Sequence, residues 1–296
     1  MTSTNTSKAS PSETFYSLAE LYASTELLED CLKSLAENAQ RFVNEATKDE
    51  GKFKTAKAAV LVFNICKKLG MPVEVRYLAV EVFDKFMSKH ITQLQEVISS
   101  SSSSNKKVDW DSVERRVIDQ IPLRAISCVQ IASKIVSNYK ALSPLKVKNF
   151  LTNSDLHFSI ECVIRSEMRV LKTLDFRLPF ISPLTYVEML LEVLRRNCPG
   201  LPATVIHDVT VKLLDVVYIE RDVIYKLLGN ATGVEIDTKL ANDSFLLATS
   251  IIVAAAYIVD SESSDSFIEQ MSLITTIKEA DIIIFSTVLV KVALDL

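Results

Sequence analysis

Residues 127–136 read SCVQIASKIV, a mostly apolar stretch that contains a single cation, Lys134. Such a run is typical of a helix buried in a protein core. A lysine at its end has two interpretations. Either the side chain lays its methylene groups on apolar surface and reaches water with its ammonium group, or a partner protein completes its surroundings. The sequence outside this stretch is needed to choose between the two interpretations.

The composition around this run predicts a packed, all-α protein. Of 296 residues, 48% are hydrophobic and 24% are charged, which is typical of a globular chain. Only 5 glycines and 8 prolines occur, so turn residues are too sparse for a protein of many short strands. The formal net charge of -4 lacks the basic excess of a nucleic-acid-binding surface, so no direct nucleic-acid binding is expected.

The cysteines and the most apolar segment predict a reducing compartment and no membrane span. The five cysteines are scattered, form no C-x-x-C pair and follow no secretory segment, so we expect free core thiols. The run FLLATSIIVAAAYI, from Phe245 to Ile258, is shorter than the roughly 20 residues that a bilayer span requires. It is therefore expected to form a central buried helix.

Helical periodicity and turn residues divide the chain into about five helices in each half. The serine run SSSSSSN, residues 99–105, has no reason to fold and predicts an inserted loop over 99–108. Pro122 is expected to separate a short helix, capped by Asp109, from the helix that holds Lys134. The predicted helices are about 25–46, 53–69, 72–90, 110–121, 122–136, 156–174, 184–196, 203–228, 239–259, 265–274 and 278–294.

Two Ser-Pro pairs predict further helix starts. Ser143-Pro144 and Ser182-Pro183 each place a hydroxyl cap directly before a proline at the first helical position. The simplest architecture is two consecutive all-α bundles. We expect a disordered or poorly ordered tail over 1–24, a first domain over 25–181 with a preceding helix, and a second helical domain over 182–296.

Catalytic motifs are absent from the sequence. The three histidines, His90, His157 and His207, have no metal-ligand spacing and are expected to be half-exposed helical residues. No phosphate-binding loop, dinucleotide fingerprint or nucleophile elbow occurs. The sequence therefore predicts a protein that is not an enzyme and holds no cofactor or metal.

Three segments resemble the cyclin family in order and in spacing. LAVEVFDKFMS, residues 78–88, resembles the second helix of a cyclin box, and SCVQIASKI resembles the third. SEMRVLKTLDFRLPFISPLTYVEMLL, residues 166–191, resembles the fifth helix and the passage into a second cyclin fold. The resemblance covers most of residues 25–296 and implies two consecutive five-helix cyclin-like bundles with an N-terminal helix.

The resemblance also implies a site and a partner. In cyclins, the lysine after alanine-serine and a glutamate of the fifth helix form the polar centre of the kinase-binding face. The matching positions are Lys134 and Glu167, flanked by Ile135 and Ala132. The expected partner is a cyclin-dependent kinase of the kinase-2-like type, whose active state the cyclin would favour by differential affinity. An ordinary surface ion pair, worth roughly 0 to 1 kcal/mol, is the other interpretation of Lys134 and Glu167.

Within the family, the match extends to a divergent member that acts in meiotic crossing-over. It implies a non-catalytic regulator that promotes the maturation of meiotic crossovers during homologous recombination. The expected locations are the nucleus and recombination sites on meiotic chromosomes, with the cytoplasm as a further compartment. The alternative is a kinase-independent all-α scaffold that binds meiotic recombination or clamp-loader proteins through apolar grooves.

Overall fold

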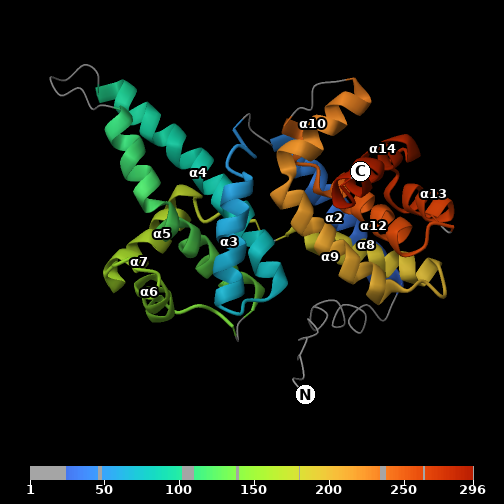
Figure 1. Cartoon of the computed structure of the whole chain (residues 1–296), viewed down its shortest axis with the longest axis horizontal. Coiled ribbons are helices and arrows are strands. Elements are labelled where there is room, and N and C mark those ends of the chain that lie inside the picture. Colours follow the sequence, from blue (N-terminus) through green and yellow to red (C-terminus); the bar gives the residue numbers. More distant parts are fainter. Residues whose placement is uncertain are drawn as a thin grey trace. The chain divides into compact units, whose positions relative to one another are not determined.

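The computed structural model describes residues 25–45, 49–101, 110–137, 140–179, 181–233, 238–262 and 264–295. In these residues every regular element is a helix, as the sequence predicts, and none is a strand (Figure 1). The predicted tail over 1–24 and the predicted cap Asp109 lie outside the described residues. The helices are α2 (Thr25–Glu45), α3 (Ala56–Lys68), α4 (Val73–Ser101), α5 (Trp110–Val136), α6 (Pro144–Thr152), α7 (Ile160–Thr173), α8 (Pro183–Asn197), α9 (Ala203–Ile219), α10 (Arg221–Thr232), α11 (Thr238–Ala241), α12 (Ser244–Val259), α13 (Ser264–Thr275) and α14 (Glu279–Ala293).

The chain packs as two compact units. One, called here the N-terminal unit, comprises Phe42–Ser182 together with Val216–Asn242. The other, the C-terminal unit, comprises the described residues of Met1–Arg41, Pro183–Asp215 and Asp243–Leu296. The predicted domain boundary at 181/182 stays a prediction.

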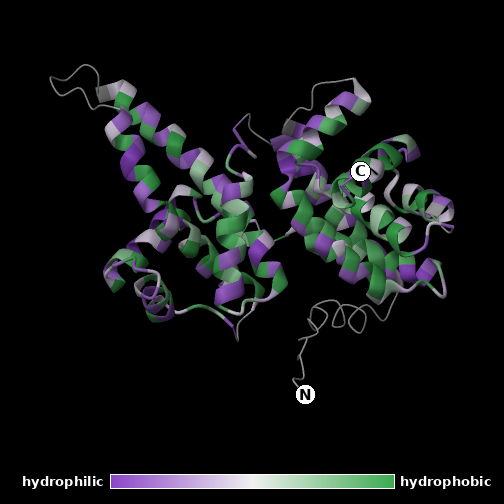
Figure 2. Ribbon diagram, in the orientation of Figure 1, coloured by the Kyte–Doolittle hydropathy of each residue, from purple (hydrophilic) through white to green (hydrophobic). Residues whose placement is uncertain are grey.

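In the N-terminal unit, α5 is the central helix. It packs against α3, α4, α6 and α7, and α4 lies along it as the other arm of a long helical hairpin (Figure 1). From Leu123 to Ser133, ten of the eleven residues of α5 are buried, which agrees with the apolar run in the sequence. Figure 2 shows hydrophilic and hydrophobic residues mixed along α4 and α5, as expected of helices with one buried face.

In the C-terminal unit, α12 takes the central place. It contacts α8, α13 and α14, and every residue from Phe245 to Ala256 is buried. The predicted buried helix over 245–258 is therefore confirmed. Among the helices of the described residues, none is long and apolar enough to span a bilayer.

Side-chain caps fix several helix starts. Ser143 Oγ accepts from the Lys146 N–H at 3.3 Å, which confirms the predicted start of α6 at Pro144. Thr55 and Ser159 cap α3 and α7 in the same way. Asp243 Oδ1 accepts from two backbone N–H groups at the start of α12. Each such cap is worth about 1 kcal/mol.

The predicted break at Pro122 is wrong, because α5 runs through it without interruption. Proline lacks the N–H that would bond the carbonyl of Ile118, one turn earlier. Ile118 is 54% exposed, so this turn of α5 lies at the surface, where the loss of one backbone hydrogen bond costs less than in the core.

The predicted loop start at residue 99 is also wrong. Helix α4 continues to Ser101. Two serine hydroxyls near its end bond carbonyls of the preceding turn: Ser99 Oγ donates to Gln95 O at 2.8 Å, and Ser100 Oγ donates to Glu96 O at 2.7 Å. The rest of the predicted loop, 102–108, lies outside the described residues.

Two predicted helices are divided in the structure. The segment 203–228 bends at Glu220, where α10 begins and Arg221 reaches the carbonyl of Ala241 at 2.9 Å. The segment 239–259 breaks before Asp243, which caps the new helix α12. The helix predicted over 156–174 begins only at Ile160, after the Ser159 cap.

The prediction of half-exposed helical histidines is wrong for all three. His90 in α4 and His207 in α9 are buried, with exposed fractions of 8% and 2%. His157 is exposed and lies outside the helices, before α7.

Candidate functional site

The structure brings Lys134 and Glu167 together. Lys134 is in the last turn of α5, and its Nζ lies 2.5 Å from Glu167 Oε1 on α7. The other carboxylate oxygen accepts a hydrogen bond from Gln130 Nε2 at 3.1 Å. The Lys134 side chain is 45% exposed, whereas that of Glu167 is 13% exposed. A cation near a helix C-terminus is favourable, so the lysine is both tolerated by its helix and presented to solvent.

Small polar residues of α5 allow α7 to approach this pair closely. Ser127 Oγ donates to Ser166 Oγ at 2.8 Å, across the two helices. Ser133 Oγ accepts from the Leu142 N–H at 2.9 Å and thereby fastens the segment that follows α5. Ala132 is fully buried, so it lies beneath the surface that carries Lys134.

Two apolar side chains are exposed on the outside of α7. Ile164, 47% exposed, lies one helical turn before Glu167, whereas Met168, 41% exposed, directly follows Glu167 in sequence and lies one turn after Ile164. On α5, Ile135 is half-buried next to Lys134. Ile164 therefore does not belong to the buried side of α7. The buried stripe runs instead through Val163, Ser166, Val170 and Thr173.

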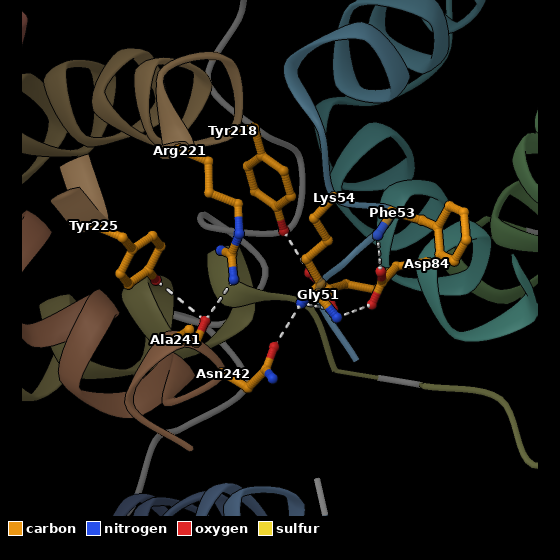
Figure 3. A network of polar contacts seen from close by, with 10 residues as sticks. Gly51, Phe53, Lys54, Asp84, Tyr218, Arg221, Tyr225, Ala241 and Asn242 are labelled. Atoms are coloured by element: carbon orange, nitrogen blue, oxygen red, sulfur yellow. Dashed lines mark hydrogen bonds and ion pairs between the residues drawn. The ribbon is translucent and has the colours of Figure 1, made fainter. Parts of the chain in front are cut away.

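A second polar centre, in the N-terminal unit, was not found from the sequence. Lys54 Nζ and Glu81 Oε2 form a buried ion pair at 2.7 Å, with exposed fractions of 10% and 12% (Figure 3). Tyr218 donates its hydroxyl hydrogen to Glu81 Oε1 at 2.8 Å. Burial alone would raise the pKa of Glu81, but the charge and hydrogen bond of Lys54 and the hydrogen bond of Tyr218 outweigh it and lower the pKa.

Asp84, one turn after Glu81, holds the segment before α3. Its two carboxylate oxygens accept from the N–H groups of Gly51, at 2.8 Å, and Phe53, at 2.9 Å (Figure 3). Gly51 has φ 88, a left-handed conformation that favours glycine. Burial raises the pKa of Asp84 and is only partly opposed by the positive charge of Lys54 and these hydrogen bonds.

Residues of α9, α10 and α11 and the adjoining Asn242 contact the same centre. Lys54 Nζ donates to Asn242 Oδ1 at 3.3 Å, and the carbonyl of Ala241 accepts from Arg221 and Tyr225 (Figure 3). The rings of Tyr77 and Tyr218 lie 5.3 Å apart. We refer to Lys54, Glu81, Asp84, Tyr218 and Arg221 as the buried network; its bonds join residues far apart in sequence.

The C-terminal unit contains an apolar groove of about 370 Å³ between α12, α13 and α14. Its lining includes Tyr257, Ile268 and Ile283, and the charged side chains Asp265 and Lys291. Tyr257 and Ile283 are 47% and 43% exposed. The groove has the character of a surface that takes up apolar side chains.

Comparison with known proteins identifies what these features resemble. Residues 30–179 match the family model "Cyclin, N-terminal domain". Cyclin N-terminal domain-containing protein 1 of Homo sapiens is 33% identical over 273 residues, which cover 88% of this chain and 83% of that protein. Its Mus musculus counterpart is also 33% identical over 273 residues, covering 88% and 82%. G2/mitotic-specific cyclin-1 of Saccharomyces cerevisiae is 24% identical over 127 residues, covering 43% and 21%.

Proposed function

This chain belongs to the cyclin family, whose members are non-catalytic regulators, and we propose that it binds a cyclin-dependent kinase of the kinase-2-like type. The proposed contact surface is formed by Lys134, Glu167 and Ile135, with Ala132 packed beneath them. The observation that carries the proposal is a lysine–glutamate pair placed among exposed apolar side chains of α7.

The geometry of the pair fits a docking surface better than a stabilising ion pair. Gln130 already donates to the other carboxylate oxygen of Glu167 and holds it in place without Lys134. The Lys134 side chain is 45% exposed, and an intramolecular ion pair of that exposure contributes little to folding. When a partner covers this surface, charged groups at its centre form stronger hydrogen bonds, and the flanking Ile164 and Met168 lose their contact with water.

The proposed mechanism is allosteric. A regulator that binds the active conformation of a kinase more tightly than the inactive one shifts the kinase population toward activity. The kinase performs the phosphoryl transfer, and this chain contributes binding free energy only.

We further propose that the chain acts in the nucleus, at recombination sites on meiotic chromosomes, where it promotes crossover maturation during homologous recombination. The support is the similarity to Cyclin N-terminal domain-containing protein 1 over 88% of the chain, taken with the resemblance in the sequence. Disruption of the gene in its own organism should leave meiotic cells with fewer crossovers per nucleus. Crossover counts equal to those of the parent strain would exclude this role.

Co-purification with a panel of cyclin-dependent kinases tests the kinase proposal. The parent chain, Lys134→Glu and Glu167→Lys are compared, with circular dichroism as the check of folding. Lys146→Glu is the matched control, because it makes the same charge change at an exposed position of α6. We expect one kinase to bind the parent and the control, and neither of the two site variants.

The charge-swapped double variant, Lys134→Glu with Glu167→Lys, separates docking from folding. It restores the attraction within the chain but reverses both charges toward a partner. We expect it to remain unbound. Recovery of kinase binding by the double variant, or binding by both single variants, would contradict the proposed surface.

A second candidate function is favoured by the groove between α12, α13 and α14. It is that of a kinase-independent scaffold, whose occupant would be an amphipathic helix of a meiotic recombination or clamp-loader protein. The apolar lining suits the buried face of such a helix, and Asp265 and Lys291 suit basic and acidic residues at its edges. Ile283→Lys would abolish binding of such a protein and leave the kinase bound, whereas Lys134→Glu would do the reverse.

A further inference from the structure

Three basic side chains from three helices converge in the N-terminal unit. His90 of α4 stacks on Phe86, with ring centroids 5.1 Å apart and an interplanar angle of 15°. The guanidinium carbon of Arg124, on α5, lies 5.9 Å from the centre of the same Phe86 ring. Arg124 Nη1 donates to Ser166 Oγ of α7 at 2.8 Å, and Arg169 follows Ser166 by one helical turn. We call His90, Arg124 and Arg169 the basic cluster.

The positive charges of Arg124 and Arg169 are not neutralised by any residue that the structure describes. Arg124 donates two of its five N–H groups to the neutral side chains of Ser166 and Gln120, and the remaining N–H groups can bind an anion. Across the described ranges, no carboxylate forms an ion pair with Arg124 or Arg169. Asp175, just after α7, pairs with Lys89 of α4, whose Nζ lies 3.5 Å from the carboxylate.

The surroundings of the histidine also suit an anion. Only 8% of His90 is exposed, and its ring forms no hydrogen bond with any residue that the structure describes. Burial, together with the positive charges of Arg169 and Arg124, lowers the pKa of His90 to about 4. Burial and Arg169 likewise lower the pKa of Arg124. Like charges held together in this way cost free energy, which a bound anion would recover.

We propose that His90, Arg124 and Arg169 bind a phosphoryl group carried by a phosphorylated serine or threonine of a partner protein. A phosphomonoester carries about -1.5 to -2 charge at neutral pH and three acceptor oxygens, which suits two guanidinium groups and an imidazole from three directions. Arginine is the side chain that recognises phosphate with paired, directed donors.

The extent and charge of the surroundings favour a phosphorylated side chain over a nucleic acid. Nucleic-acid surfaces track many phosphates with a stripe of basic residues, whereas the cluster offers three groups at one point in a chain of net charge -4. The proposal is independent of kinase binding, since it uses neither Lys134 nor Glu167.

Histidine resonances of the full chain, recorded by NMR, test the proposal. The chain has three histidines, so His157 and His207 act as internal references for His90. The probes are inorganic phosphate, a pool of short peptides with one fixed phosphoserine, and the same pool with unmodified serine, all at constant ionic strength. We expect a saturable shift of the His90 resonance with phosphate, tighter binding of the phosphoserine pool and no response to the serine pool.

The matched variants are Arg169→Gln and Arg165→Gln, which remove the same group from neighbouring exposed turns of α7. We expect Arg169→Gln to weaken phosphoserine binding by about tenfold, as for the loss of a charge-assisted hydrogen bond, and Arg165→Gln to leave it unchanged. Equal weakening by both variants would mean that the peptide responds only to the general positive charge of α7, and this result would overturn the proposal.

The other outcomes are equally decisive. A His90 resonance that responds to no probe overturns the site itself. Phosphoserine peptides that bind no more tightly than inorganic phosphate assign the site to the free ion, against a protein partner. A duplex oligonucleotide that shifts His90 at lower concentration than the phosphoserine pool would assign it to nucleic acid instead.

Discussion

Lys54→Met is expected to destabilise the N-terminal unit by about 3 to 5 kcal/mol, because it leaves the buried carboxylate of Glu81 without its cation. The pair has exposed fractions of only 10% and 12%, so solvent cannot replace the lost lysine. Tyr218 remains as a hydrogen-bond donor to Glu81 but carries no charge. Glu81 is therefore the group that bears the cost.

The combined variant Lys54→Met with Glu81→Gln isolates that cost. It removes both charges and keeps an oxygen that accepts from Tyr218, so most of the lost stability should return. Urea unfolding followed by circular dichroism at neutral pH measures both variants against the parent. The reasoning fails if Lys54→Met costs less than about 1 kcal/mol, or if the double variant is as unstable as the single one.

The pH dependence supplies a second signature of the same pair. In the parent, the lowered pKa of Glu81 means that its contribution is present above the unfolded-state pKa and is lost as pH falls through the folded-state pKa. In Lys54→Met, burial is left as the main influence and raises the pKa of Glu81. The deficit of this variant should therefore shrink as acid protonates the carboxylate, and a deficit that is constant with pH would point to lost packing instead.

Three further predictions concern single groups. Ser143→Ala removes the cap of α6 and should lower the free energy of unfolding by about 1 kcal/mol in urea titrations; no change would mean that water replaces the cap. Gly233→Ala should cost about 1 to 2 kcal/mol in the same assay, because φ is 68 at the end of α10, and a neutral result would mean that the helix end relaxes. Iodoacetamide should alkylate Cys162 before Cys66 and Cys128 in the folded chain, as peptide mass mapping would show. Hydrogen bonds from Ser159 and Arg165 lower the pKa of the Cys162 thiol. Burial raises the pKa of the Cys66 thiol to about 12 and raises the pKa of the Cys128 thiol further. Equal rates for the three thiols would contradict that order.

Local chemistry made the helix starts predictable from sequence. Ser143-Pro144 combines a hydroxyl cap with a proline that needs no N–H, and α6 begins there. The same local reasoning failed at Pro122 and at Ser99, because α5 continues through the proline at an exposed turn and α4 continues through its serines. Whether a helix tolerates such residues depends on their surroundings in the fold, which sequence spacing does not give.

The pairing of Lys134 with Glu167 could be predicted only through the cyclin resemblance. Periodicity placed the two residues on helices but could not show that α5 and α7 cross at this point. The exposure of Ile164 could not be predicted, because α7 has apolar residues on two sides and hydrophobicity alone does not say which side faces the bundle.

The buried network and the basic cluster were beyond sequence reasoning for a different reason. Tyr218 bonds a residue 137 positions away, and Asn242 bonds one 188 positions away, so no local pattern links them. Arg124 and Arg169 look like ordinary charges of helix surfaces in the sequence. Their proximity follows from three-dimensional packing around Phe86 and Ser166.

Gln130 shows that the pair of Lys134 and Glu167 is arranged at the expense of stability. Its side chain is fully buried and donates to Glu167, while its Oε1 is buried and has no hydrogen-bond partner among the residues that the structure describes. An unsatisfied buried acceptor costs about 1 to 3 kcal/mol, which an apolar side chain at the same place would avoid. What the chain gains is a Glu167 carboxylate fixed in place before any partner arrives. Since ordering a side chain on binding costs free energy, this prior fixation would favour association with a partner, as the proposed kinase contact requires, more than it favours folding.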